Sequence, residues 1–243
     1  MRFLSKTYIK SHEVQSDLYV RFPHLVRIFQ DAAFEHSNSV GAGVSELIKR
    51  GLAWVLYSMY IEVYDYPKLN DKITTITWSK GRKGITSERD YQVFSGNKKI
   101  ILASTTWVLF NLGKRKATNI PEEIVSVYKP EKFNVFPRAA KILPYDKNMS
   151  YEYSYKFQTR FLDLDSNNHV NNITYIDYIC TAIYRVLQEH VFISNFNITY
   201  KKEITIDVEN VEIQLSKTLN EFYFRITSGN TLFALGRVVY YNK

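Results

Sequence analysis

The chain consists of two versions of one pattern, and this repeat constrains its fold more than any other feature. Each version begins with a short extended segment rich in Tyr and Phe, over residues 8–22 and again over residues 153–164. Apolar residues then recur at helical spacing, which predicts one amphipathic helix in each half. The two apolar faces comprise Leu25, Ile28, Phe29, Ala32 and Ala33 in the first half, and Ile173, Ile176, Cys180, Ile183 and Leu187 in the second.

Segments rich in β-forming residues follow each helix and predict antiparallel strands. They cover residues 73–78, 89–94 and 100–110 in the first half, and 204–208, 211–215 and 222–226 in the second. The last two strands of each half meet at Ser-Gly-Asn, at 95–97 and at 228–230, which indicates a hairpin turn. Because a helix must bury its apolar face and a sheet must cover one face, we expect a curved antiparallel sheet wrapped around one helix, made twice.

A stretch with several prolines, residues 121–144, separates the two halves and is the best candidate for a linker. We expect a first unit over residues 1–130, a linker over 131–148 and a second unit over 149–243. The chain has 243 residues, of which 45% are hydrophobic, so there is enough apolar material for a core.

The formal net charge of +8 favours an acidic partner, such as nucleic acid, an anionic membrane or an acidic carrier protein. The basic residues form short scattered clusters without a nucleic-acid-binding motif, so we expect no nucleic-acid partner. The longest apolar stretch, residues 51–63, is shorter than the ~20 residues of a spanning helix, so no stable membrane insertion is expected. A single cysteine and the lack of a signal-peptide pattern point to the cytoplasm.

Four polar residues stand at every second position immediately before the second predicted helix: Asp163, Asp165, Asn167 and His169. Helix capping explains one or two of these residues. Helix capping does not require a histidine, because the helix dipole disfavours a cation at the N-terminus of a helix. A neutral imidazole suits a general base, and free N–H groups of residues 169–171 could stabilise an oxyanion. The cluster therefore predicts a catalytic site, one or two of whose residues also cap the helix.

Other chemistries fit this segment less well. It opens like a calcium loop, but Asn168 and Thr174 stand where that loop needs Gly and a bidentate Glu. A zinc site lacks enough nearby ligands, so no metal is expected. Cys180 lies on the apolar helix face, which predicts a buried, inert thiol. A non-catalytic lipid-binding module would leave the cluster unexplained.

The segment Asp-Leu-Asp-Ser-Asn-Asn-His-Val-Asn-Asn-Ile-Thr-Tyr-Ile, residues 163–176, resembles the most diagnostic segment of the acyl-acyl carrier protein thioesterases of plants and bacteria. The match extends over nearly the whole chain. It includes Gly-Leu-Ala-Trp-Val at 51–55, Tyr-Asp-Tyr-Pro-Lys at 64–68, Thr77-Trp78, Arg89-Asp90, Trp107-Val108 and the segment 111–121.

This resemblance implies an α+β double hot-dog fold and an enzyme that hydrolyses fatty acyl-acyl carrier protein (acyl-ACP) to a free fatty acid and the carrier, without a cofactor. The family's functional residues match Asp165, Asn167 and His169, with an acid on the following strand at Glu203. Plant members usually have a Cys directly after this acid. Here Ile204 stands there, which excludes a thiol nucleophile at that point. Thr181 also departs from the family, since an acid is expected within the helix.

In the implied mechanism, Asp165 and His169 activate water, Asn167 orients the carbonyl or a partner, and Glu203 holds the water or assists as base. The division of these roles is left open. The first unit has no such cluster at its helix start, so we expect one active site per chain and an acyl-chain pocket in the first unit. An acyl-coenzyme A thioesterase of the same fold is the nearest alternative. The oligomeric state is left open, with a homodimer as one alternative.

Overall fold

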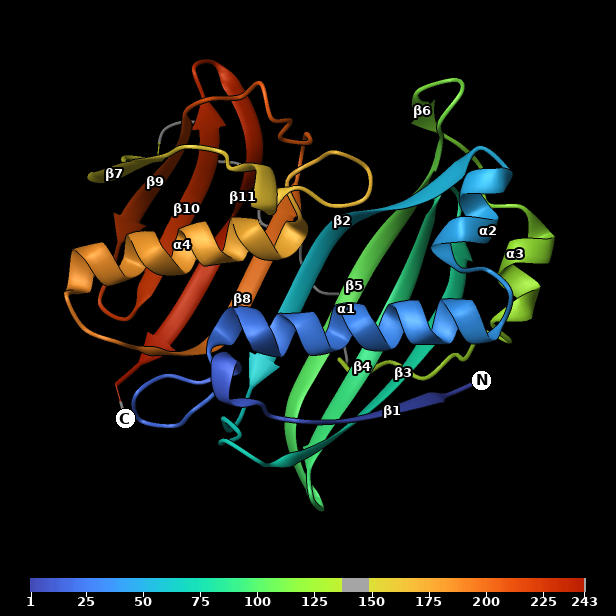
Figure 1. The fold of residues 1–243 in the computed structure, drawn as a ribbon, viewed down its shortest axis with the longest axis horizontal. Coiled ribbons are helices and arrows are strands. Elements are labelled where there is room, and N and C mark those ends of the chain that lie inside the picture. Colours follow the sequence, from blue (N-terminus) through green and yellow to red (C-terminus); the bar gives the residue numbers. More distant parts are fainter. Residues whose placement is uncertain (137–148, 243) are drawn as a thin grey trace. The chain divides into compact units, whose positions relative to one another are not determined.

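The computed structural model describes residues 1–136 and 149–242, and the chain forms two compact units, Met1–Ala140 and Lys141–Lys243. In each unit one long helix lies across the strands of an antiparallel sheet (Figure 1). This confirms the predicted α+β fold class. The predicted linker, residues 131–148, lies mostly outside the described residues, so the domain bounds stay a prediction.

The first unit has the sheet order β1-β3-β4-β5-β2, with β6 paired to β5. Its elements are β1 (Phe3–Tyr8), the 3-10 turn η1 (Ser11–Glu13), α1 (Phe22–Ser39), α2 (Val44–Lys49), β2 (Leu52–Val63), β3 (Lys72–Lys83), β4 (Thr86–Ser95), β5 (Lys98–Asn111), β6 (Lys116–Ala117) and α3 (Glu122–Val127). The predicted helix is α1, which buries Leu25, Phe29 and Ala32. Strand β2 was not predicted, because a register shift between Leu56 and Ser58 breaks its apolar alternation.

The second unit has the sheet order β8-β11-β10-β9-β7. Its elements are β7 (Tyr153–Phe157), the 3-10 turn η2 (Phe161–Asp163), α4 (Asn172–Leu187), β8 (Phe192–Tyr200), β9 (Val211–Lys217), β10 (Glu221–Ser228) and β11 (Thr231–Tyr241). The strand predicted over residues 204–208 is wrong, because Thr205 forms only an isolated bridge to His169 and Ile206 is 48% exposed. The structure instead forms strand β8, which ends at Tyr200, before the predicted segment.

The two Ser-Gly-Asn tripeptides form the predicted hairpin turns. Ser95 pairs with Lys98 across the first turn, and Ser228 pairs with Thr231 across the second. Gly96 has φ of 57° and Gly229 has φ of 54°. Glycine is favoured here because this left-handed conformation strains other residues.

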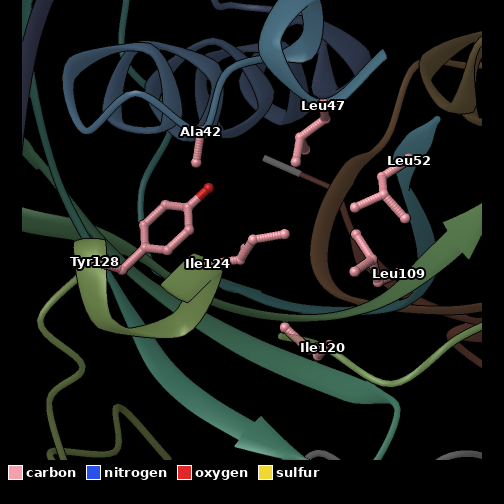
Figure 2. Packing of buried hydrophobic residues seen from close by; sticks show 7 residues of the cluster. All are labelled: Ala42, Leu47, Leu52, Leu109, Ile120, Ile124 and Tyr128. Carbon is pink, nitrogen blue, oxygen red and sulfur yellow. The ribbon is translucent and has the colours of Figure 1, made fainter. Parts of the chain in front are cut away.

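A separate apolar cluster holds the two short helices of the first unit (Figure 2). It comprises Ala42, Leu47, Leu52, Leu109, Ile120, Ile124 and Tyr128. The side chains of α2 and α3 here meet the ends of β2 and β5, so these short helices are stabilised by tertiary packing rather than by their own length. None of the helices among the described residues is long and apolar enough to cross a membrane.

Candidate active site

The loop between η2 and α4 is anchored at its start by Asp163. This side chain is 3% exposed and accepts hydrogen bonds from the Arg160 guanidinium at 2.7 Å and from the Tyr178 hydroxyl at 2.6 Å. Burial alone would raise the pKa of Asp163, but the bonds from Arg160 and Tyr178 lower it, so the carboxylate stays charged. Its contacts give Asp163 a structural role in holding this loop.

Asp165 shapes the turn that presents His169. Its Oδ1 atom accepts the backbone N–H of Asn167 at 2.8 Å and that of His169 at 3.3 Å. Its own N–H donates to the His169 carbonyl at 2.8 Å. Asn168 takes a left-handed conformation, with φ of 59°, which suits asparagine in a tight turn. The carboxylate of Asp165 is therefore engaged with the loop backbone.

His169 and Glu203 are brought together by backbone contacts between their segments. The Val170 N–H donates to the Ile204 carbonyl at 2.8 Å, and His169 bridges to Thr205. These contacts bring the His169 Nε2 atom to 3.4 Å from Glu203 Oε2. The side chains are 32% and 47% exposed, so water and a substrate can reach them. Glu203 follows β8 rather than lying on a strand, which corrects the sequence expectation.

The backbone donors predicted for an oxyanion are already engaged. The N–H groups of His169, Val170 and Asn171 donate to Asp165 Oδ1, to the Ile204 carbonyl and to the Asp163 carbonyl. That prediction is therefore wrong, because these amides hold the loop together. Within the described part of the chain, the Asn172 N–H at the start of α4 and the exposed side-chain amide of Asn167 have no acceptor.

The first unit contains a structural copy of this loop. Both copies have the same 3-10 turn, the same helix start and a left-handed residue at the same place, Leu18 with φ of 65° in the first. Several backbone bonds also match. Gln15 N–H donates to the Tyr19 carbonyl at 2.9 Å, and Val20 N–H donates to the Pro67 carbonyl at 3.0 Å. The fold of this loop therefore does not depend on the residues proposed for catalysis.

The copy in the first unit lacks the titratable pair. Tyr19 occupies the position of His169, Tyr66 that of Glu203, and Gln15 that of Asp165. The ring of Tyr19 is covered by the Lys68 ammonium at 4.6 Å from its centroid. No imidazole–carboxylate pair is formed by these positions, which supports the prediction of one active site per chain.

Two further features of the second unit bear on its chemistry. A polar cleft of about 410 Å³ includes Glu203 in its wall, together with Thr205, Asn210, Ser228 and Thr231. Cys180 is partly buried on α4, and desolvation raises the pKa of its thiol. A thiol that resists ionisation is a poor nucleophile, which agrees with the inert thiol predicted for Cys180.

Two family models match the chain. The acyl-ACP thioesterase N-terminal domain matches residues 1–128, and the C-terminal domain matches residues 146–233. The chain belongs to the acyl-ACP thioesterase family. The second match includes every member of the candidate site, and the resemblance seen in the sequence is confirmed.

Curated members of the family are similar over most of the chain. An oleoyl-acyl carrier protein thioesterase of Arabidopsis thaliana is 25% identical, over 94% of this chain and 66% of that protein. A dodecanoyl-[acyl-carrier-protein] hydrolase of Cinnamomum camphora is 31% identical, over 82% of this chain and 55% of that protein. The chain thus spans less than two thirds of the length of these relatives.

Solved structures of the family show the same fold. The 12:0-ACP thioesterase from Umbellularia californica matches with a TM-score of 0.88 and 24% identity, over 100% of this chain and 98% of that chain. An acyl-ACP thioesterase from Bacteroides thetaiotaomicron matches with a TM-score of 0.84 and 20% identity, over 99% and 98%. These likenesses establish the double hot-dog fold.

Proposed function

We propose that this protein hydrolyses the thioester of fatty acyl-ACP and releases a free fatty acid and the carrier. The observation that carries the proposal is the His169–Glu203 pair, 3.4 Å apart and accessible beside the start of α4. Family membership adds the reaction class, because relatives in this family are named as acyl-ACP thioesterases and hydrolases. The proposed catalytic residues are Asp165, Asn167, His169 and Glu203.

In the proposed reaction, His169 takes a proton from a water molecule that Glu203 helps to hold. The water oxygen attacks the thioester carbonyl, and the carbon–sulfur bond breaks from the tetrahedral intermediate. His169 then returns the proton to the leaving thiolate, which gives the free thiol of the carrier. The carboxylates of Glu203 and Asp165 stabilise the imidazolium that forms between these steps.

The oxyanion of the intermediate needs hydrogen-bond donors that are not used by the fold. The Asn172 N–H at the helix start and the Asn167 side-chain amide meet this condition. Asn167 would thus orient the carbonyl, as its place in the family segment implies.

The polar cleft beside Glu203 suits the amide-containing arm that joins the acyl group to its carrier. A fatty acyl chain would not be stabilised by Thr205, Ser228 and Thr231, since it needs an apolar surface. The acyl-chain pocket is proposed for the first unit instead, as the family resemblance implies.

The choice between carriers can be tested directly, because the nearest alternative is an acyl-coenzyme A thioesterase. We expect a higher kcat/KM for the acyl-ACP than for the coenzyme A thioester of the same fatty acid. The measurement is fatty acid release from both substrates over a series of chain lengths. Equal or greater kcat/KM for coenzyme A at every length would favour the alternative.

Raising the ionic strength is expected to raise KM for acyl-ACP. The protein has a net charge of +8, and salt screens its attraction for an acidic carrier over a Debye length of ~10 Å at 0.1 M. The comparison is KM between low and moderate salt, with a small neutral thioester as the control for direct salt effects. A KM for acyl-ACP that does not change would argue against electrostatic docking.

We also propose that the reaction takes place in the cytoplasm. A chain with the single cysteine Cys180 can form no internal disulfide, which fits a reducing compartment. The curated plant relatives are chloroplast proteins. Fractionation of cells that express this protein, followed by immunodetection, would test the placement.

A further inference from the structure

One buried tyrosine contacts the backbone on both sides of Glu203. Tyr175, in the first turn of α4, is 2% exposed. Its hydroxyl accepts the N–H of Ile204 at 3.0 Å and donates to the carbonyl of Lys202 at 3.4 Å. Burial raises the pKa of Tyr175, so the hydroxyl keeps its proton and can both donate and accept.

Glu203 is held in place by the backbone on either side of it. Its residue lies beyond the end of β8 at Tyr200, outside any strand, and its side chain is 47% exposed. The N–H groups of Lys201 and Lys202 both donate to the Phe233 carbonyl before Glu203, and the Val170 N–H donates to the Ile204 carbonyl after it. The Tyr175 hydroxyl adds a bond on each side of Glu203 from the helix. Tyr175 thus ties Glu203 to the helix that begins next to His169.

The first unit shows that the fold does not require this hydroxyl. The residue at the position of Tyr175 there is Leu25, and the residue at the position of Ile204 is Pro67, which has no N–H to satisfy. The crossing of the two segments still forms, through the bond from Val20 to Pro67. The tyrosine is therefore present in the unit with the titratable pair and replaced in the unit without it.

We propose that Tyr175 is a positioning residue for the reaction, which holds the Glu203 carboxylate at its working distance from His169. This inference rests on the proposed function, because it needs Glu203 to take part in hydrolysis. The hydroxyl does not touch the reacting atoms. It acts by fixing Lys202 and Ile204, whose backbone directs the side chain between them.

The test is a double-mutant cycle with Tyr175→Phe and Glu203→Gln, measured as kcat and KM for acyl-ACP. We expect Tyr175→Phe to lower kcat about tenfold or more with little change in KM, because small displacements of catalytic groups are costly. In the Glu203→Gln background the same change should lower kcat less than about twofold, because the two residues act as a unit.

Tyr240→Phe is the matched control. Its hydroxyl also donates to a backbone carbonyl of the second unit, that of Leu219 at 3.4 Å, which lies in the turn between β9 and β10 and away from residues 202–204. This variant should keep kcat within about twofold of wild type, as expected for a buried hydroxyl without a catalytic partner. Circular dichroism and thermal melting of all variants establish that each one is folded.

Three outcomes would overturn the inference. One is a folded Tyr175→Phe with near wild-type kcat, and another is an equal loss of kcat in both backgrounds, which would mean a general structural role. The third is full activity of Glu203→Gln, which would mean that the Glu203 carboxylate takes no part in hydrolysis. If the wild-type protein releases no fatty acid from acyl-ACP, the proposed function itself fails, and that result is distinct from a neutral Tyr175→Phe in an active enzyme.

Discussion

Replacing His169 with alanine is expected to lower kcat for acyl-ACP hydrolysis by ~10²-fold or more, the usual scale for losing acid–base help. The imidazole is the only group in the proposed mechanism that moves a proton from water to the leaving thiolate. It lies 3.4 Å from the Glu203 carboxylate, and the backbone of His169, rather than its ring, holds the loop. The variant should therefore fold normally and bind substrate.

The structure offers a control at the corresponding position of the first unit. Tyr19→Ala removes the side chain that stands where His169 stands in the second unit, and it should leave kcat within about threefold, as expected away from the catalytic groups. A near-normal kcat for His169→Ala would contradict the assignment of His169 as the general base. An equal loss in Tyr19→Ala would mean that both loops contribute.

Asp165→Asn is also expected to lower kcat by ~10²-fold. Its amide oxygen can still accept the N–H groups of Asn167 and His169, so the turn should persist while the negative charge is lost. The variant thus separates the charge of Asp165 from its effect on loop shape. Normal turnover would limit Asp165 to shaping the loop.

Acid is expected to destabilise the protein through His36, by about 3 kcal/mol between pH 6.5 and pH 4, since His36 is fully buried with its pKa lowered from 6.5 to about 4. Burial is the main cause, and the neighbouring Arg89 guanidinium adds to it. The Nδ1 atom lies 2.9 Å from Arg89 Nη1, and the ring stacks on Phe3.

The direction follows from the lowered pKa. The unfolded chain binds a proton at His36 more readily than the folded chain, so the stabilisation is complete above pH 6.5 and is lost as the pH falls toward 4. Other groups have shifts of their own, such as the raised pKa of Asp90. The effect of His36 is therefore best measured as a difference from a variant.

His36→Asn keeps an acceptor for Arg89 but does not titrate in this range. Denaturant unfolding of both proteins at several pH values gives the free energy of unfolding as a function of pH. We expect the wild type to lose about 3 kcal/mol more than the variant between pH 7 and pH 4. Parallel pH profiles would show that His36 is not desolvated as described.

Much of the fold could be predicted because it depends on local patterns. The helical spacing of Leu25, Phe29 and Ala32 gave α1, and Gly96 and Gly229 gave the two hairpins. Strand β8 escaped prediction because Ser194, Asn195 and Asn197 interrupt its apolar residues, whereas the exposed segment that follows alternates more regularly. Apolar alternation alone cannot distinguish a paired strand from an extended loop.

The proposed catalytic side chains could be predicted from the sequence, but the contacts that hold them in place could not. Asp165, Asn167 and His169 share one short segment, and the family resemblance added Glu203. Tyr175 was missed because its partner is the backbone N–H of a residue 29 positions away, which leaves no side-chain pattern. The loop copy in the first unit was missed because its backbone bonds match while its side chains differ.

The most direct test of this account is the release of fatty acid from a chain-length panel of acyl-ACP substrates by wild-type protein and by His169→Ala. The account predicts hydrolysis by the wild type with at least one chain length, and a loss of ~10²-fold or more in the variant at that length. A wild-type protein that releases no fatty acid from any member of the panel, or a variant that is as active as wild type, would contradict it.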